Sequence, residues 1–161
     1  MHSLGKVIIR SAGAFLLLIT VTVLQAEAQA ADQHNHTHNG HTAPVLSLDD
    51  GNKWQTDGPL RKGMENINEE VMQSVAAYHN ESLTKADAEK LSKNINEQVA
   101  YIVENCKLEP RADAVLHILI GDLLTAAGHL ASDPLSDQGL HAIVKTLHTY
   151  PVYFEHQGWN D

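Results

Sequence analysis

The stretch PRADAVLHILIGDLLTAAGHL, residues 110–130, decides the fold. Its apolar residues recur every three or four positions, which is the spacing of one face of an α-helix. They also cover much of the helix circumference, so we expect this helix to be the most buried one in the protein. Such a helix needs other amphipathic helices around it, and the rest of the chain must supply them.

Three further segments show the same helical spacing of apolar residues. The first follows the start signal Asp57-Gly58-Pro59, and the second follows the capping box Thr84-x-x-Asp87. The last is expected to begin at Ser132-Asp133-Pro134 and to end at Pro151, because proline cannot continue a helix. The apolar faces comprise Leu60, Met64, Ile67, Val71, Val75 and Tyr78, then Leu91, Ile95, Val99, Ile102 and Cys106, and finally Leu140, Val144 and Leu147.

Four amphipathic helices joined by short links predict an all-α protein, specifically an up-down-up-down four-helix bundle. Residues 45–161 form this bundle domain, and three-helix or irregular packings are the alternatives. The residues Val45 to Leu48 indicate a short extended piece, followed by a turn and Trp54. No strand-rich stretch predicts a sheet.

Residues 1–30 have the pattern of a cleavable signal peptide. Lys6 and Arg10 precede an unbroken apolar run, AFLLLITVTVL at 14–24, which is too short to span a membrane as a helix. Ala28-Gln29-Ala30 is a small-x-small cleavage site. We therefore expect export to the bacterial periplasm and no membrane association after cleavage, with a retained N-terminal anchor as the alternative.

The exported chain is acidic. Cleavage removes Lys6, Arg10 and Glu27, so 9 basic and 19 acidic residues remain, a net charge of −10. This charge disfavours nucleic acid and anionic membrane surfaces as partners and suits the attraction of cations.

Residues 31–44, ADQHNHTHNGHTAP, form a polar segment with almost no apolar residue to bury, and we expect a disordered arm. Four histidines, His34, His36, His38 and His41, fall within eight residues. Imidazole binds zinc, copper and nickel, and two or more imidazoles on a flexible arm can chelate one ion. The sequence thus predicts a weak, exchangeable metal site here, and the alternative is a solvated linker.

A second candidate metal site follows from the bundle topology. In an up-down-up-down bundle the starts of the first and third helices and the ends of the second and fourth lie at the same end of the bundle. Met64, Cys106, His117 and His148 would then converge, and the carboxylate of Asp113 would orient the His117 ring. A thioether, a thiol and imidazoles form the ligand set of Cu(I), or of zinc without the thioether. The alternative is that these side chains are structural or solvent-exposed. Under that alternative His141, like His148, faces solvent.

Cys106 leaves three alternatives open because it is the one cysteine of the chain. It is a buried inert thiol, a metal ligand or a link between two chains. Pairing with His117 as a catalytic thiolate is not supported by any recognisable oxyanion donor or substrate pocket. No hydrolase, metalloprotease or phosphate-binding motif is present, so we expect no enzyme.

Two blocks of sequence carry a resemblance to a known family. LxxGxKWxTDxPLRxGM, residues 48–64, and NCKLxPxADxxLH, residues 105–117, resemble an uncharacterised DnrO-like family of small secreted proteins of proteobacteria. The resemblance covers residues 46–131. It implies a signal peptide, a histidine-rich leader and a periplasmic location, but no established activity.

A looser resemblance is to the four-helix cytochromes b562 and c′. Met64 near the start of the first helix and a histidine late in the fourth, such as His148, are similar to the b562 ligands. This resemblance implies noncovalent haem b held between those residues. Covalent attachment is excluded because no CxxCH is present, and Pro151 argues against His156 as a ligand.

The sequence as a whole predicts a periplasmic metal-binding protein that buffers or sequesters metal ions. Copper is the favoured ion and zinc the next, and no protein partner is indicated. The alternatives are a haem-binding electron-transfer bundle and a metal-free interaction or stress module.

Overall fold

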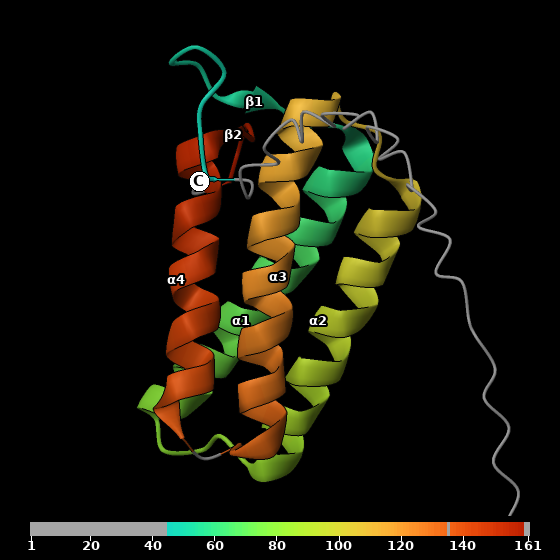
Figure 1. The fold of residues 1–161 in the computed structure, drawn as a ribbon. Helices are drawn as coiled ribbons and strands as arrows, with labels where there is room; N and C mark the ends of the chain where they lie inside the picture. The colour runs from blue at the N-terminus through green and yellow to red at the C-terminus, as the bar shows by residue number, and fades with distance from the viewer. Residues whose placement is uncertain (1–44, 135, 160–161) are drawn as a thin grey trace, which may run out of the picture. The chain divides into compact units, whose positions relative to one another are not determined.

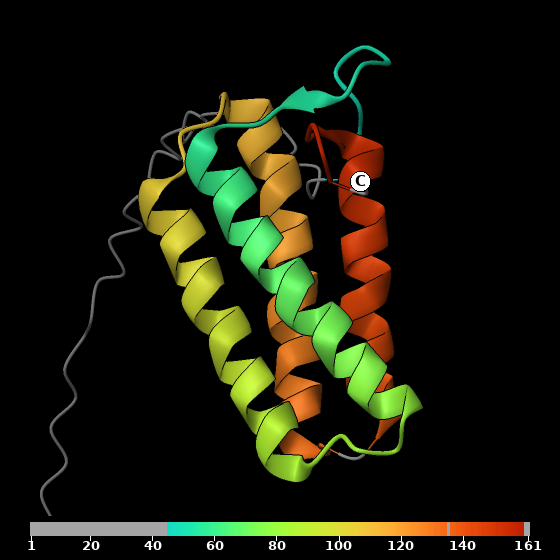
Figure 2. The same cartoon turned by 180° about the vertical axis from the view of Figure 1, so that it is seen from behind.

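The computed structural model describes residues 45–134 and 136–159, so the predicted signal peptide and histidine-rich arm lie outside the described residues. The described part forms a four-helix bundle of α1 (Gly58–His79), α2 (Lys85–Asn105), α3 (Pro110–Ser132) and α4 (Asp137–Tyr153). Successive helices run in opposite directions, and α3 packs against both α2 and α4 (Figures 1 and 2). The predicted all-α, up-down-up-down bundle is confirmed.

The predicted start signals of the first two helices are confirmed. The Asp57 carboxylate accepts the backbone N–H of Leu60 at 2.9 Å, which caps α1. Thr84 and Asp87 form the reciprocal capping box of α2. Each cap satisfies backbone donors that have no partner inside the first helical turn.

The predicted boundaries of the fourth helix are wrong at both ends. The motif at 132–134 lies at the end of α3, because the backbone N–H of Asp133 still bonds to His129, and Ser136 caps α4 instead. Pro151 lies inside α4, which continues to Tyr153. A proline in a last turn removes a single helical hydrogen bond, and the fully buried side chains of Tyr150 and Phe154 hold the chain on either side of it.

The core is built from the inward faces of all four helices. The largest completely buried side chains come from every helix and from the segment that follows α4, and they comprise Leu60, Met64, Ile67, Ile95, Ile102, Leu116, Leu119, Leu123, Leu130, Ile143, Tyr150 and Phe154. In the fourth helix the predicted Leu140 and Leu147 are buried, but Ile143 is buried as well, whereas the predicted Val144 is half-buried. The prediction that α3 is the most buried helix agrees with its nine buried residues, more than in any other described helix.

Two glycines allow helices to approach closely. A Cβ atom on Gly139 of α4 would lie 2.7 Å from the backbone nitrogen of Leu130 in α3. A Cβ atom on Gly63 of α1 would collide with the side chain of Ile102 in α2. The first contact is with backbone and the second with a side chain that can rotate, so Gly139 is the stricter requirement.

A short parallel strand pair was not predicted from the sequence. β1 (Trp54–Gln55), just before α1, pairs with β2 (Phe154–Glu155), just after α4. The Thr56 hydroxyl adds a hydrogen bond to the Glu155 carbonyl at 2.7 Å. A two-residue strand has no measurable alternation of polar and apolar residues, so no sequence period could reveal it.

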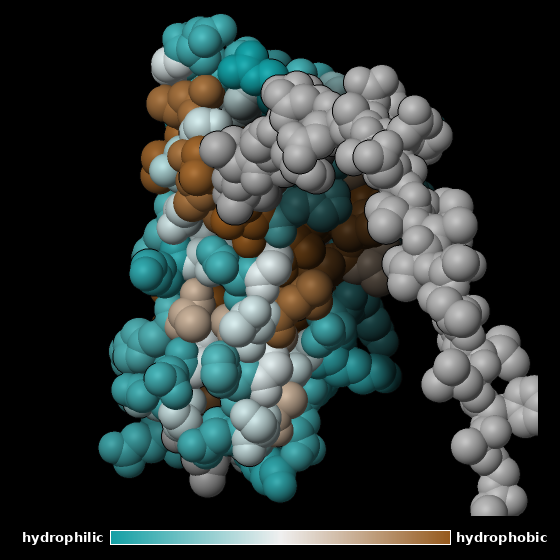
Figure 3. All heavy atoms as spheres, in the orientation of Figure 1, coloured by the Kyte–Doolittle hydropathy of each residue, from teal (hydrophilic) through white to brown (hydrophobic). Residues whose placement is uncertain are grey.

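α3 is also long and apolar enough to cross a membrane, with a mean hydropathy of 1.6. A central helix of a bundle has the same composition, since it is covered on two sides, and α3 lies between α2 and α4. Figure 3 shows hydrophobic side chains on the upper half of the face it draws and mostly hydrophilic ones on the lower half.

Candidate functional site

The predicted ligands of the bundle-end metal site lie in different environments. Met64 is completely buried in the core, Cys106 is half-buried at the end of α2, and His117 and His148 are exposed on α3 and α4. Within residues 45–134 and 136–159 there is no group of three or more His, Cys, Asp or Glu side chains placed to hold a metal ion. The expected convergence of these residues is therefore not seen in the described structure.

The predicted pairing of His117 with Asp113 is present. The Nδ1 atom of His117 lies 2.9 Å from the backbone oxygen of Asp113 and 3.4 Å from its carboxylate. A ring nitrogen that faces two acceptors carries the proton, which leaves Nε2 as the nitrogen able to bind a ligand. One exposed imidazole of this kind gives at most a single ligand.

The thiol of Cys106 is held in its protonated form. Burial, with the hydrogen bond to the Asp57 carboxylate and the charges of Asp57 and Asp113, raises the pKa of the Cys106 thiol to about 12. Thiolates are the nucleophiles and the metal ligands, so this cysteine is poorly suited to either role at neutral pH.

Asp57 ties the start of α1 to the loop between α2 and α3. Besides capping Leu60, its carboxylate accepts the backbone N–H of Lys107 at 2.6 Å. Partial burial raises the pKa of Asp57, but the hydrogen bonds from Lys107, Leu60 and Cys106 outweigh that effect, and the net pKa lies below its usual value. The ionised carboxylate therefore stabilises this end of the bundle.

Replacement Asp57→Asn is expected to lower the free energy of unfolding at pH 7 by about 1 to 2 kcal/mol, because an amide NH₂ would face one of the two backbone N–H donors. Since the folded pKa is depressed, the contribution is complete above the unfolded pKa of about 3.9 and is lost as pH falls through the folded value. Urea unfolding at pH 7, 5, 4 and 3 should show the two proteins converging at low pH. Asp122→Asn, an exposed position on α3, is the control, and a pH-independent difference would contradict this account.

The end of the bundle carries a buried polar network that sequence reasoning missed. The His156 side chain is completely buried. Its Nδ1 atom lies 3.1 Å from the Tyr150 hydroxyl, and its Nε2 atom lies 3.0 Å from the Glu65 carboxylate of α1. A helix ending at Pro151 would leave His156 without a place in the bundle, but α4 continues to Tyr153 and β2 follows it, so that His156 packs against Tyr150.

Aromatic side chains surround this network. Burial is the main cause that raises the pKa of Tyr150 above its usual value, so its hydroxyl stays protonated and donates. Tyr150 also stacks on Phe154 at 5.3 Å and meets the edge of Trp159 at 4.8 Å between ring centroids. The three aromatic side chains close this end of the bundle.

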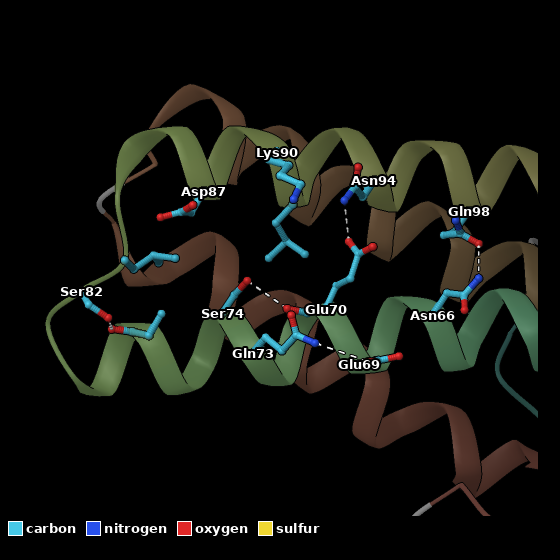
Figure 4. Close-up of a pocket in the computed structure, with 13 residues that line it drawn as sticks. Asn66, Glu69, Glu70, Gln73, Ser74, Ser82, Asp87, Lys90, Asn94 and Gln98 are labelled. Atoms are coloured by element: carbon cyan, nitrogen blue, oxygen red, sulfur yellow. Dashed lines mark hydrogen bonds between the residues drawn. The ribbon is translucent and has the colours of Figure 1, made fainter.

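Two of the hollows on the described surface lie between α1 and one of its neighbouring helices. The larger is a polar groove of about 720 Å³ between α1 and α2 (Figure 4). The smaller, of about 140 Å³, is lined from α1 by Val75, Tyr78 and His79 and from α4 by Asp137, Leu140, His141 and Val144. Neither of these two hollows is lined by Met64, Cys106, His117 or His148.

The other predicted metal ligands, His34, His36, His38 and His41, lie outside the described residues. Comparison with models of protein families, with curated proteins and with solved structures finds no match to this chain, so its function must be argued from its own residues.

Proposed function

We propose that this chain is an exported, periplasmic metal-binding protein that buffers or sequesters copper, or in second place zinc, and is not an enzyme. The observation that carries the proposal is the density of imidazoles next to the predicted cleavage site, four within the eight residues from His34 to His41. Several imidazoles close together in sequence chelate borderline metal ions without a folded scaffold.

Two observations support the proposal that the arm, and not the bundle, binds the metal. Of the bundle's four candidate ligands, Met64 is completely buried, the Cys106 thiol is held protonated, and His117 and His148 are exposed on different helices. The net charge of the exported chain is −10 once the predicted signal peptide is removed, which favours the approach of cations over anions. In this proposal the bundle is the folded domain to which the metal-binding arm is attached.

Titration of the exported chain, residues 31–161, with Cu²⁺ and separately with Zn²⁺ tests the proposal by calorimetry. Replacing His34, His36, His38 and His41 by Asn is expected to weaken binding at least about tenfold, because each lost imidazole removes a metal–ligand bond. Binding should also weaken as pH falls, since imidazoles must be deprotonated to bind.

The matched control removes the bundle ligands instead, with Cys106→Ser, His117→Asn and His148→Asn in one chain. This variant is expected to bind both metals as the parent does. If the control loses the metal while the arm variant keeps it, the bundle-end residues are the site and the assignment to the arm is wrong.

A further inference from the structure

Tyr150 is the only completely buried tyrosine of the four in the chain. Among the described residues its hydroxyl group has one hydrogen-bond partner, the Nδ1 atom of His156 at 3.1 Å. Burial is the main cause that raises the pKa of the Tyr150 hydroxyl above its usual value, so the phenol is not ionised at neutral pH. If this phenol loses its proton, the imidazole is therefore the group placed to accept it.

A path for that proton leads from the buried phenol toward the surface. The Nε2 atom of His156 lies 3.0 Å from the Glu65 carboxylate, and the Glu65 side chain is 60% exposed. When Nδ1 takes up the phenol proton, both ring nitrogens become donors, and Nε2 already faces an acceptor. A carboxylate in that position stabilises the imidazolium through a charge-assisted hydrogen bond.

A second aromatic side chain connects the same phenol to the outside. Trp159 meets Tyr150 with ring centroids 4.8 Å apart and an interplanar angle of 61°. Trp159 is 8% exposed, whereas Tyr150 has no exposed surface. Indole and phenol are the two aromatic side-chain groups that give up a single electron most readily. An electron from Tyr150 can therefore pass through Trp159 to an oxidant at the surface.

The charges around Tyr150 suit a site that becomes positive when it loses an electron. The carboxylates of Glu65 and Asp57 and the guanidinium of Arg61 all act on its hydroxyl group. The Cys106 thiol, which also lies near it, stays protonated because its pKa is raised to about 12. Two negative groups against one positive group stabilise the charge that the departing electron leaves behind.

We propose that Tyr150 is a redox-active tyrosine, which a one-electron oxidant converts to a neutral tyrosyl radical while His156 accepts its proton. The O–H bond of Tyr150 breaks, and the proton forms an N–H bond at Nδ1. The electron leaves through Trp159 and reduces the oxidant, a diffusible inorganic radical of high potential, by one electron. One electron from a reductant later returns the radical and the proton to the phenol. This activity does not depend on the proposed metal binding.

Flash oxidation of the exported chain, residues 31–161, by photogenerated tris(bipyridine)ruthenium(III) tests the proposal. Electron paramagnetic resonance and transient absorption follow the tyrosyl radical, and the part of the signal that Tyr150→Phe removes belongs to Tyr150. In His156→Asn an amide oxygen can accept the phenol hydrogen bond but cannot take up the proton, so formation of this radical should slow at least about tenfold. Glu65→Gln, which keeps an acceptor for Nε2 without the charge, should slow it about threefold. His129→Asn, the same substitution at an exposed position on α3, should change nothing.

Circular dichroism establishes first that each variant is folded. If His156→Asn fails to fold, Glu65→Gln and the rate in deuterated water, which should be slower because an O–H bond breaks, provide the test. The proposal is overturned if Tyr150→Phe removes none of the radical signal. It is also overturned if the Tyr150 radical forms as fast in His156→Asn, or in Glu65→Gln and deuterated water, as in the parent. An unchanged rate in Trp159→Phe would overturn the electron path through Trp159.

Discussion

Replacement of Gly139 by alanine is expected to lower the free energy of unfolding by about 3 kcal/mol, and the melting temperature by on the order of 10 °C. The added Cβ would lie 2.7 Å from the backbone nitrogen and 2.8 Å from the Cα of Leu130. Backbone atoms cannot rotate away, so α4 must move off α3 and open the core where these helices meet. Thermal and urea unfolding followed by circular dichroism measure the loss.

Gly128→Ala is the matched control for that replacement. Gly128 is exposed on α3, and a Cβ atom there would meet nothing within 4 Å. Alanine is a better helix former than glycine, so this variant should gain about 0.5 to 1 kcal/mol. The two substitutions are chemically identical and should act with opposite signs. A loss of stability in both, or in neither, would contradict the close α3–α4 contact.

His156→Ala is expected to cost about 3 kcal/mol of unfolding free energy. The substitution leaves a cavity and strips the buried Tyr150 hydroxyl of the partner that lies 3.1 Å from it. It also releases the segment after α4 from Glu65 of α1. His148→Ala, which removes an exposed imidazole from α4, should change stability by less than about 0.5 kcal/mol.

A double-mutant cycle separates the network from simple packing. Tyr150→Phe alone should cost about 1 to 2 kcal/mol, since it leaves Nδ1 of the buried His156 without a partner. In the His156→Ala background, Tyr150→Phe should cost about 1 kcal/mol less, because there is no imidazole whose Nδ1 atom could lose its hydrogen-bond partner. Strictly additive losses would mean that the hydroxyl and the imidazole do not interact in solution.

The parts of the fold that repeat along the sequence were predictable from it. The 3.6-residue period located all four helices, and the caps at Asp57 and Thr84 fixed two starts. The fourth helix was misplaced because Asp133-Pro134 has the composition of a start signal, although Ser136 provides the actual cap. Whether such a motif starts a helix depends on whether the backbone N–H groups beside it lack partners. This in turn depends on where the preceding helix ends.

The bundle end shows what sequence reasoning cannot reach. The topology correctly brought the starts of α1 and α3 and the ends of α2 and α4 together (Figures 1 and 2). It did not show which way the side chains point, so Met64 became core and His117 became surface. The residues that do meet there, Glu65, Tyr150 and His156, depend on a two-residue strand pair between segments about a hundred positions apart.

The proposed metal binding is tested most directly by expressing the full sequence with its predicted signal peptide and measuring the metal content and absorbance spectrum of the protein recovered from the periplasmic fraction. The chain in which His34, His36, His38 and His41 are replaced by Asn is measured alongside it. The account predicts copper or zinc at about one equivalent or more in the parent chain, its loss from the variant, and no Soret band. A metal-free parent chain would contradict it, as would metal that survives in the variant or iron accompanied by a Soret band.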